Sequence, residues 1–145
     1  MSRAPSYFKL IMTTCLTLHL NNYCNRYMLY TNLTHLETAA DLSRMIAENE
    51  NVMVVCGRMG PQCIPVYRIA ESLESEYREV KFCDMEFNNP ESLIIRDLPE
   101  VEYFNSIPFT VYYQNGQAVK AFSGVQSKEQ ITGNINELFL KTEKV

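Results

Sequence analysis

Two cysteines on either side of a glycine-containing turn could perform thiol–disulfide chemistry. Cys56 and Cys63 are separated by six residues, among them Gly57 and Gly60. A disulfide needs two Cα atoms about 4.4–6.8 Å apart, and two glycines could let the turn fold back that far. Cys63 is expected in the first turn of a helix, where the helix dipole and free amides stabilise a thiolate, and Arg58 adds positive charge. This pattern predicts a redox pair in which Cys63 has the lowered pKa.

An alternative interpretation places Cys56 in the core. It directly follows the continuous apolar run Val52–Val55, and free cysteine is among the most buried residue types. Cysteines at this spacing are not diagnostic of any one site. Both interpretations of Cys56 stay open, whereas Cys83 alternates with Phe82 and Asp84 in a predicted strand and is expected to be a core residue.

Other polar residues are weaker candidates. Asp84 and Glu86 lie at the end of that strand and could reach a pocket, but we expect both to be solvated acids. His19 and His35 are too few and too scattered to form a metal site with the cysteines, because zinc usually takes four closely set ligands. We therefore expect no metal.

The helices that must position these residues begin at recognisable capping sequences. Two of the starts are capping boxes, and a third has asparagine as the cap and proline at the first helical position. A further helix is expected to run from the turn at Gly60 through Tyr77. The three start sequences are Thr34 with Glu37, Asn89 with Pro90, and Ser127 with Gln130.

The predicted strands alternate with these helices before a final hairpin. A strand–helix–strand crossover makes a parallel pair, and a hairpin makes an antiparallel one. Asn115-Gly116 is a strong hairpin signal. The sequence therefore predicts an α/β fold with a mixed central sheet of about four to five strands and helices on both faces. The strand-like runs are Val52–Val55, Val80–Met85, Phe109–Tyr113 and Ala118–Phe122.

This order of elements and three local sequences resemble the thioredoxin family over most of the chain, from about residue 31 to residue 140. The stretch Cys63–Tyr77 is similar to the helix that begins at the second active-site cysteine of the family. Ser106–Thr110 matches the Ile-Pro-Thr segment of the family, and Tyr113–Gly116 with Gly124 resembles its final hairpin. The resemblance implies a thioredoxin-like fold in which the Ile107–Pro108 bond is cis and Pro108 faces the active site.

The active-site motif of that family is altered here. The family works through Cys-Gly-Pro-Cys, usually after a Trp, and this sequence contains no Trp. With Cys63 at the second cysteine, Gly60 holds the place of the nucleophile, while an alignment on Gly60-Pro61 puts Met59 and Gln62 at the two cysteine positions. The buried acid of the family falls at or near Val54. What remains is a displaced pair, Cys56 and Cys63.

Two functions follow from these observations. In the first, a thiol–disulfide oxidoreductase, Cys56 or Cys63 attacks a partner disulfide and the other cysteine resolves the mixed disulfide. It would need protein thiols or disulfides and an external reductase as partners, and no cofactor. The second is a redox-inactive binding module of the same fold that docks partner peptides near Pro108. The implied docking residues are Pro108, Ile107, Met59, Gly60 and Pro61.

Composition and charge argue against other classes of protein. The 145 residues give room for one domain of ordinary size. Thirteen basic and 17 acidic residues give a net charge of −4, and binding to nucleic acid needs a clustered excess of Lys and Arg. No apolar run approaches the ~18 residues that span a bilayer. We expect a monomer that binds neither nucleic acid nor membranes.

The first part of the chain differs from the rest. Residues 1–36 contain Arg3, Lys9 and Arg26 but no acid, as in some targeting peptides. A disordered extension, or a true start at Met28, is the alternative, which we favour because no cleavage signal is clear. We assign residues 1–30 to an extension and residues 31–145 to the thioredoxin-like domain. The expected location is the cytoplasm, or another compartment reached through residues 1–27.

Overall fold

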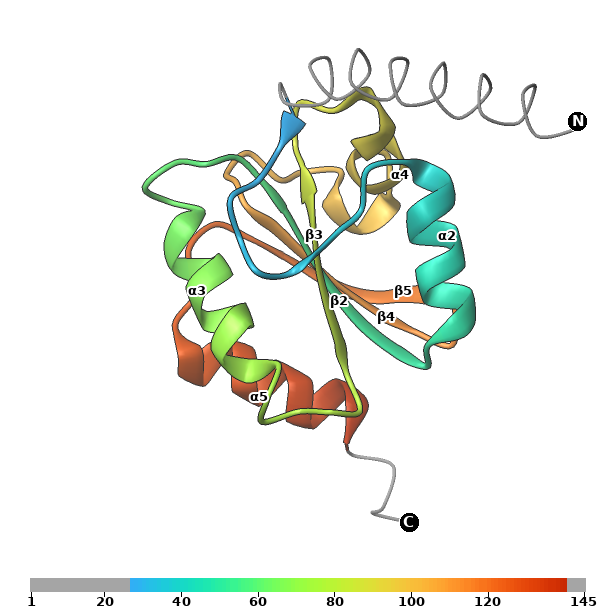
Figure 1. Ribbon diagram of the computed structural model, residues 1–145, viewed down its shortest axis with the longest axis vertical. Coiled ribbons are helices and arrows are strands. Elements are labelled where there is room, and N and C mark those ends of the chain that lie inside the picture. Colours follow the sequence, from blue (N-terminus) through green and yellow to red (C-terminus); the bar gives the residue numbers. More distant parts are fainter. Residues whose placement is uncertain (1–26, 141–145) are drawn as a thin grey trace, which may run out of the picture.

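A five-stranded mixed sheet forms the centre of the computed structural model, which describes residues 27–140 (Figure 1). The strands are β1 (Thr34–His35), β2 (Asn51–Gly57), β3 (Lys81–Glu86), β4 (Phe109–Gln114) and β5 (Gln117–Ser123). Their order across the sheet is β1-β3-β2-β4-β5. β3 is parallel to both of its neighbours, whereas β4 is antiparallel to β2 and to β5. The predicted α/β class with a mixed sheet is confirmed.

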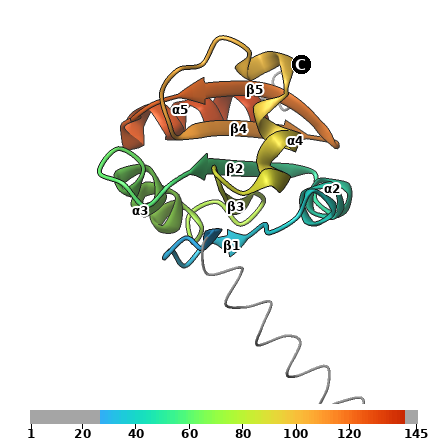
Figure 2. The ribbon, with the colours of Figure 1, turned by 90° about the horizontal axis from the view of Figure 1, so that it is seen from above.

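Helices cover both faces of this sheet. They are α2 (Ala39–Glu48), α3 (Ile64–Leu73), α4 (Leu93–Arg96) and α5 (Lys128–Phe139), with short 3-10 turns at η2 (Pro90–Ser92) and η3 (Pro99–Val101). In Figure 1, α3 and α5 lie on one side of the sheet and α2 and α4 lie on the other, and Figure 2 shows the same arrangement from above. We call these sides the α3/α5 face and the α2/α4 face.

The residues of β2 divide between two cores. Successive strand residues point to opposite faces, so Met53 and Val55 pack in the cluster on the α3/α5 face. Val54 and Cys56 pack in the cluster on the α2/α4 face. Every residue of β2 is buried, which explains why the strand reads as a continuous apolar run with no alternation.

The first helix begins later than predicted, after Thr38 and not after Thr34. Thr34 and His35 form β1, whose backbone pairs with Cys83 and Asp84 of β3. The capping box that begins α2 is formed by Thr38 and Asp41 instead. Both Thr34 and Thr38 are followed three residues later by an acid, so the sequence pattern alone does not distinguish them. Pairing with β3 decides in favour of Thr38.

The other local signals are confirmed. Asn115 and Gly116 have φ values of 52° and 82°, the left-handed conformation that a tight hairpin requires. Ser127 and Gln130 form the capping box of α5. The regular part of α3 ends at Leu73, earlier than expected, although the N–H of Tyr77 still donates to the Leu73 carbonyl at 2.9 Å.

The chain before β1 also contributes to the core. Leu29 and Leu33 are 3 % and 4 % exposed and belong to the cluster on the α3/α5 face. Leu29, which precedes the predicted domain boundary, is thus part of the hydrophobic core. The expected extension lies almost wholly outside the described residues, and its boundary near residue 30 stays a prediction. Among the helices of residues 27–140, none has the length and apolar character needed to cross a membrane.

Candidate functional site

Cys63 lies at the start of α3, at the end of the turn that follows β2. The N–H groups of Cys63 and Ile64 both donate to the Gly60 carbonyl, at 3.1 and 3.0 Å. The Cys63 Sγ accepts a hydrogen bond from the Arg58 N–H at 3.4 Å. Cys63 is only 1 % exposed. The thiol is therefore folded under the turn, away from solvent.

Three side chains converge on Gly57, the last residue of β2. A Cβ at this position would lie 2.8 Å from Cys63 Sγ, 2.8 Å from Tyr67 Oη and 3.0 Å from Pro108 Cβ. These separations are too short for a real side chain, because neighbours in a packed core have little room to move. Glycine thus allows the thiol, the phenol and the proline to meet at the end of β2.

Burial controls the acidity of this thiol. Desolvation raises the pKa of Cys63 above its ordinary value, while the N–H and charge of Arg58 and the Tyr67 hydroxyl lower it by less. Burial also raises the pKa of Tyr67, which moves this phenol still further from ionisation. The expected lowered pKa of Cys63 is wrong. The helix N-terminus and Arg58 are present as predicted, but the thiol is too buried for them to prevail.

Cys56 lies on the other face of the sheet. It belongs to the α2/α4 cluster together with Cys83, whereas Cys63 belongs to the α3/α5 cluster. Burial raises the pKa of Cys56 to about 12 and that of Cys83 to about 12. All three thiols are free. The structure thus places the two predicted partners in different core clusters, on opposite faces of the sheet.

The segment before β4 lies against the turn that holds Cys63. The Ile107–Pro108 bond is cis, and Pro108 is buried beside Gly57. Its carbonyl accepts a hydrogen bond from the Gly124 N–H at 2.9 Å. Ile107 is half-buried and packs against both core clusters, and its peptide groups make no hydrogen bond within residues 27–140.

The other expected docking residues form the turn itself. Met59 is half-buried against the α3/α5 cluster, and its sulfur accepts a hydrogen bond from the Tyr30 N–H at 3.3 Å. Gly60 is half-buried, and Pro61 is exposed. The turn therefore presents a partly apolar surface to solvent, while Cys63 lies beneath it.

Comparison with solved structures identifies the architecture. Plasmodium falciparum thioredoxin superposes with a TM-score of 0.61 at 20 % identity, covering 73 % of this chain and 99 % of that one. Mitochondrial thioredoxin 3 of Saccharomyces cerevisiae gives 0.61 at 21 % identity, with 73 % and 95 % covered. Fasciola hepatica thioredoxin gives 0.58 at 26 % identity, with 72 % and 98 % covered. The chain has the thioredoxin fold. No protein-family model matches the sequence, and a comparison with curated proteins also found no match.

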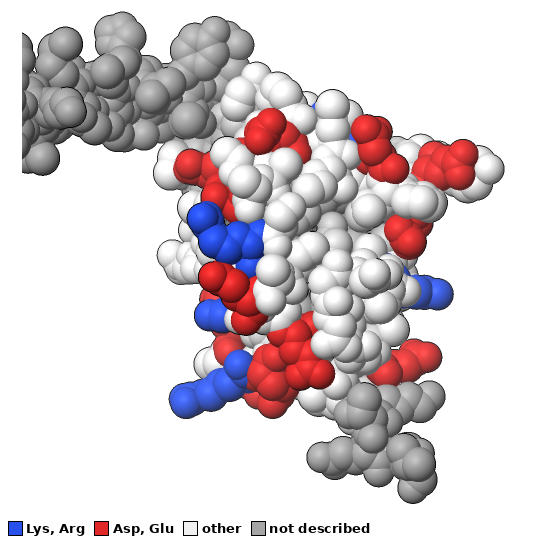
Figure 3. Space-filling model, turned by 90° about the vertical axis from the view of Figure 1, so that its right-hand side faces the viewer, with Lys and Arg blue, Asp and Glu red and all other residues white. Residues whose placement is uncertain are grey.

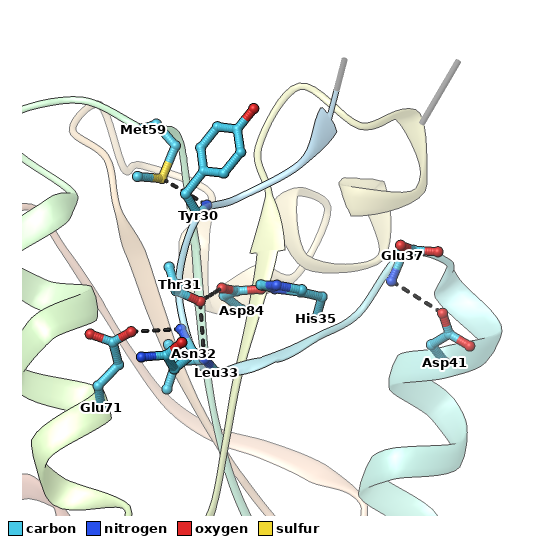
Figure 4. A network of polar contacts seen from close by, with 10 residues as sticks. All are labelled: Tyr30, Thr31, Asn32, Leu33, His35, Glu37, Asp41, Met59, Glu71 and Asp84. Carbon is cyan, nitrogen blue, oxygen red and sulfur yellow. Dashed lines mark hydrogen bonds and ion pairs between the residues drawn. The ribbon is translucent and has the colours of Figure 1, made fainter. Parts of the chain in front are cut away.

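Within this thioredoxin fold, a polar network at the end of β3 was missed by the sequence analysis (Figure 4). The Thr31 hydroxyl donates to Asp84 Oδ2, and His35 Nδ1 lies 2.7 Å from Asp84 Oδ1. Asp84 and Glu86 are 1 % and 7 % exposed, so the expectation that both acids are solvated is wrong. β1 and the chain before it cover the end of β3, and a two-residue strand leaves no periodic signal in a sequence.

Burial raises the pKa of Asp84, and the hydrogen bonds from Thr31 and His35 oppose that change. This carboxyl differs from the buried acid that the resemblance assigns near Val54. Val54 is fully buried in the α2/α4 cluster, as an apolar core residue. The network holds β1 against β3 at one edge of the sheet, whereas Val54 lies in β2, in the middle of the sheet.

Proposed function

We propose that this protein is a thioredoxin-fold binding module that docks an extended segment of a protein partner beside Pro108. The observation that carries the proposal is the backbone of Ile107, a half-buried residue beside Pro108, whose peptide groups make no hydrogen bond within the described residues. An extended peptide could pair with these groups in the manner of an added strand. Met59 and Ile107 would supply apolar contacts on either side.

The environment of the thiols favours binding over catalysis. The attacking species in disulfide exchange is a thiolate that must reach its partner. Cys63 is buried with a raised pKa, and Cys56 faces the opposite core. In the alignment on Cys63, the position of the exposed nucleophile is held by Gly60, which has no side chain. Partners that carry thiols or disulfides, as expected for this fold, would thus be bound without being reduced.

The second candidate is the thiol–disulfide oxidoreductase with Cys56 and Cys63 as its pair. The hydrogen bond from the Arg58 N–H to Cys63 Sγ favours it, because such a contact stabilises a thiolate. This activity requires the turn between β2 and α3 to open, so that Cys63 becomes exposed and the two sulfurs can approach each other. An external reductase would then restore the thiols.

Oxidation of the full chain separates the two functions. Air-oxidised protein is mapped by proteolysis and mass spectrometry, and its exchange with an aromatic disulfide is timed. The binding module leaves Cys56 and Cys63 as free thiols, neither faster than Cys83. A Cys56–Cys63 disulfide that a mild dithiol reduces would instead establish the oxidoreductase, and Ser at either position would abolish exchange while Cys83→Ser would not.

Docking is tested separately by an NMR titration with a capped pentapeptide of alternating Thr and Val. Binding is expected to shift the amide resonance of Ile107 in the wild-type protein. Ile107→Pro removes the free N–H and should weaken that binding. Val119→Pro places a proline at an exposed position on β5, away from Pro108. It is the matched control and should leave peptide binding unchanged. Equal binding by wild type and Ile107→Pro would contradict the proposed docking site.

A further inference from the structure

A hollow lies beside the carboxyl ends of β1 and β3. Its volume is about 290 Å³, and it shares no lining residue with the thiol site. One wall comes from residues that follow β1, another from the end of β3 and η2, and a third from Met28 and Leu29. In open α/β sheets the carboxyl ends of parallel strands are a common place for ligands. The hollow and the thiol site thus have different lining residues, although Glu86 is paired with Gly57 in the sheet.

The charged lining of this pocket is mostly acidic, and neutral polar side chains of Tyr27, Thr38 and Asn89 complete it. Four carboxylates reach it, those of Glu37, Asp84, Glu86 and Glu91, and the one basic side chain in the lining is His35. The face that carries α2 also shows more acidic than basic side chains (Figure 3). Arg58 and Arg96 do not line the pocket, and their guanidinium groups lie over the Phe87 ring, 5.2 and 5.1 Å from its centroid.

Glu86 is the buried carboxylate of the pocket lining that has no hydrogen-bond partner among residues 27–140. Asp84 accepts hydrogen bonds on both oxygens, from Thr31 and His35, and Glu91 Oε1 accepts from the Ala39 N–H at 3.0 Å. Glu86 is 7 % exposed and lines the pocket, and its Oε2 is fully buried without a hydrogen-bond partner among residues 27–140, so a ligand in the pocket would meet the other carboxylate oxygen. A buried carboxylate without a partner is costly, so a donor with positive charge would gain a strong interaction there.

We propose that this pocket binds an organic cation, an ammonium or amidinium group carried on a small apolar body, with the cationic nitrogen hydrogen-bonded to Glu86. The acidic lining supplies the charge, and Met28, Leu29 and Leu36 supply the apolar wall. A metal ion fits less well, because no group of three or more His, Cys, Asp and Glu in the described part of the chain is placed to hold one.

The cationic group that this pocket binds could come from either of two sources. One is a free small molecule. The other is the chain itself, because residues 1–26 contain Arg3, Lys9 and Arg26 and no acid. An experiment on the full chain distinguishes them if these three residues are replaced together by alanine.

The test is an NMR titration of the full chain with benzamidinium and with neutral benzamide, which has nearly the same shape. Benzamidinium is expected to shift the resonances of Leu36 and Glu86 and to bind at least about tenfold more tightly than benzamide. Glu86→Gln should weaken benzamidinium binding about tenfold. Glu102→Gln, an exposed acid outside the pocket, is the matched control and should leave it unchanged.

Every result of these titrations supports or overturns the proposed cation pocket. Binding by the wild-type chain supports a free cation as the ligand, and binding that requires the Arg3→Ala, Lys9→Ala, Arg26→Ala variant supports an internal one. Equal affinity for benzamide, no loss in Glu86→Gln, or no binding by either form of the chain would overturn the proposal. The comparison of benzamidinium with benzamide uses chains in which Glu86 is unchanged, so it holds even if Glu86→Gln alters the fold.

Discussion

At the scale of single residues, the thiol site is set by what surrounds Gly57. The sequence indicated a glycine-containing turn and a cysteine at a helix start, and both exist. It could not indicate that Tyr67 and Pro108 would press on the same point, because those contacts join three segments far apart in the chain. The burial that follows reverses the expected direction of the Cys63 pKa. Local signals give the type of residue, and tertiary packing decides its chemistry.

The crowding at Gly57 predicts a large effect of one methyl group. Gly57→Ala places a Cβ 2.8 Å from both Cys63 Sγ and Tyr67 Oη, and overpacking of this kind lowers the free energy of unfolding by about 1–3 kcal/mol. Urea denaturation measures the change. Gly60→Ala is the control, since a Cβ there meets nothing within 4 Å. Equal effects at the two glycines would show that the convergence on Gly57 is not tight.

The network around Asp84 predicts a pH-dependent stability. Burial raises the pKa of Asp84 above its ordinary 3.8, so between the two pKa values the folded chain binds more protons at this site than the unfolded chain. The contribution of Asp84 to stability therefore falls as pH rises through that window. Asp84→Asn lacks this term, and its stability relative to wild type should increase as pH rises from 3.8 upward. Parallel stability curves for the two proteins, measured by urea denaturation, would contradict the raised pKa.

At the scale of elements, most of the fold could be predicted because its signals are local. The hairpin through Asn115 and Gly116 and the capping box of α5 are each contained within a few residues. β1 could not be predicted, because two residues carry no periodicity and its identity depends on pairing with β3. For the same reason the helix start was assigned to Thr34, and the burial of Asp84 and Glu86 under this edge was missed.

The corrected start of α2 predicts which threonine matters for that helix. The Thr38 hydroxyl accepts the hydrogen bond from the Asp41 N–H at 3.0 Å. Thr38→Ala should lower the free energy of unfolding by about 1 kcal/mol, the usual cost of losing such a cap. Thr34→Ala, at an exposed position of β1, serves as the comparison and should cost less. If urea denaturation shows a larger loss of unfolding free energy for Thr34→Ala, then Thr34 and not Thr38 caps the helix.

At the scale of the whole molecule, one sheet separates two cores, and each core contains at least one of the described thiols. Cys56 and Cys83 lie on the α2/α4 face, and Cys63 lies on the α3/α5 face. β2 contributes side chains to both cores, and every one of its residues is buried. A domain of this size usually unfolds as one cooperative unit, so both faces should become accessible together.

This arrangement predicts how the thiols respond to a labelling reagent. In a Cys15→Ser, Cys24→Ser background, all three remaining cysteines should react slowly without denaturant, because each is buried. Their rates should rise together with urea and parallel the unfolding transition, since exposure of each requires the loss of both cores. Mass spectrometry of peptides measures the three rates. If Cys63 alone reacts quickly in the native protein, the turn between β2 and α3 opens locally, and the oxidoreductase becomes the better account of the site.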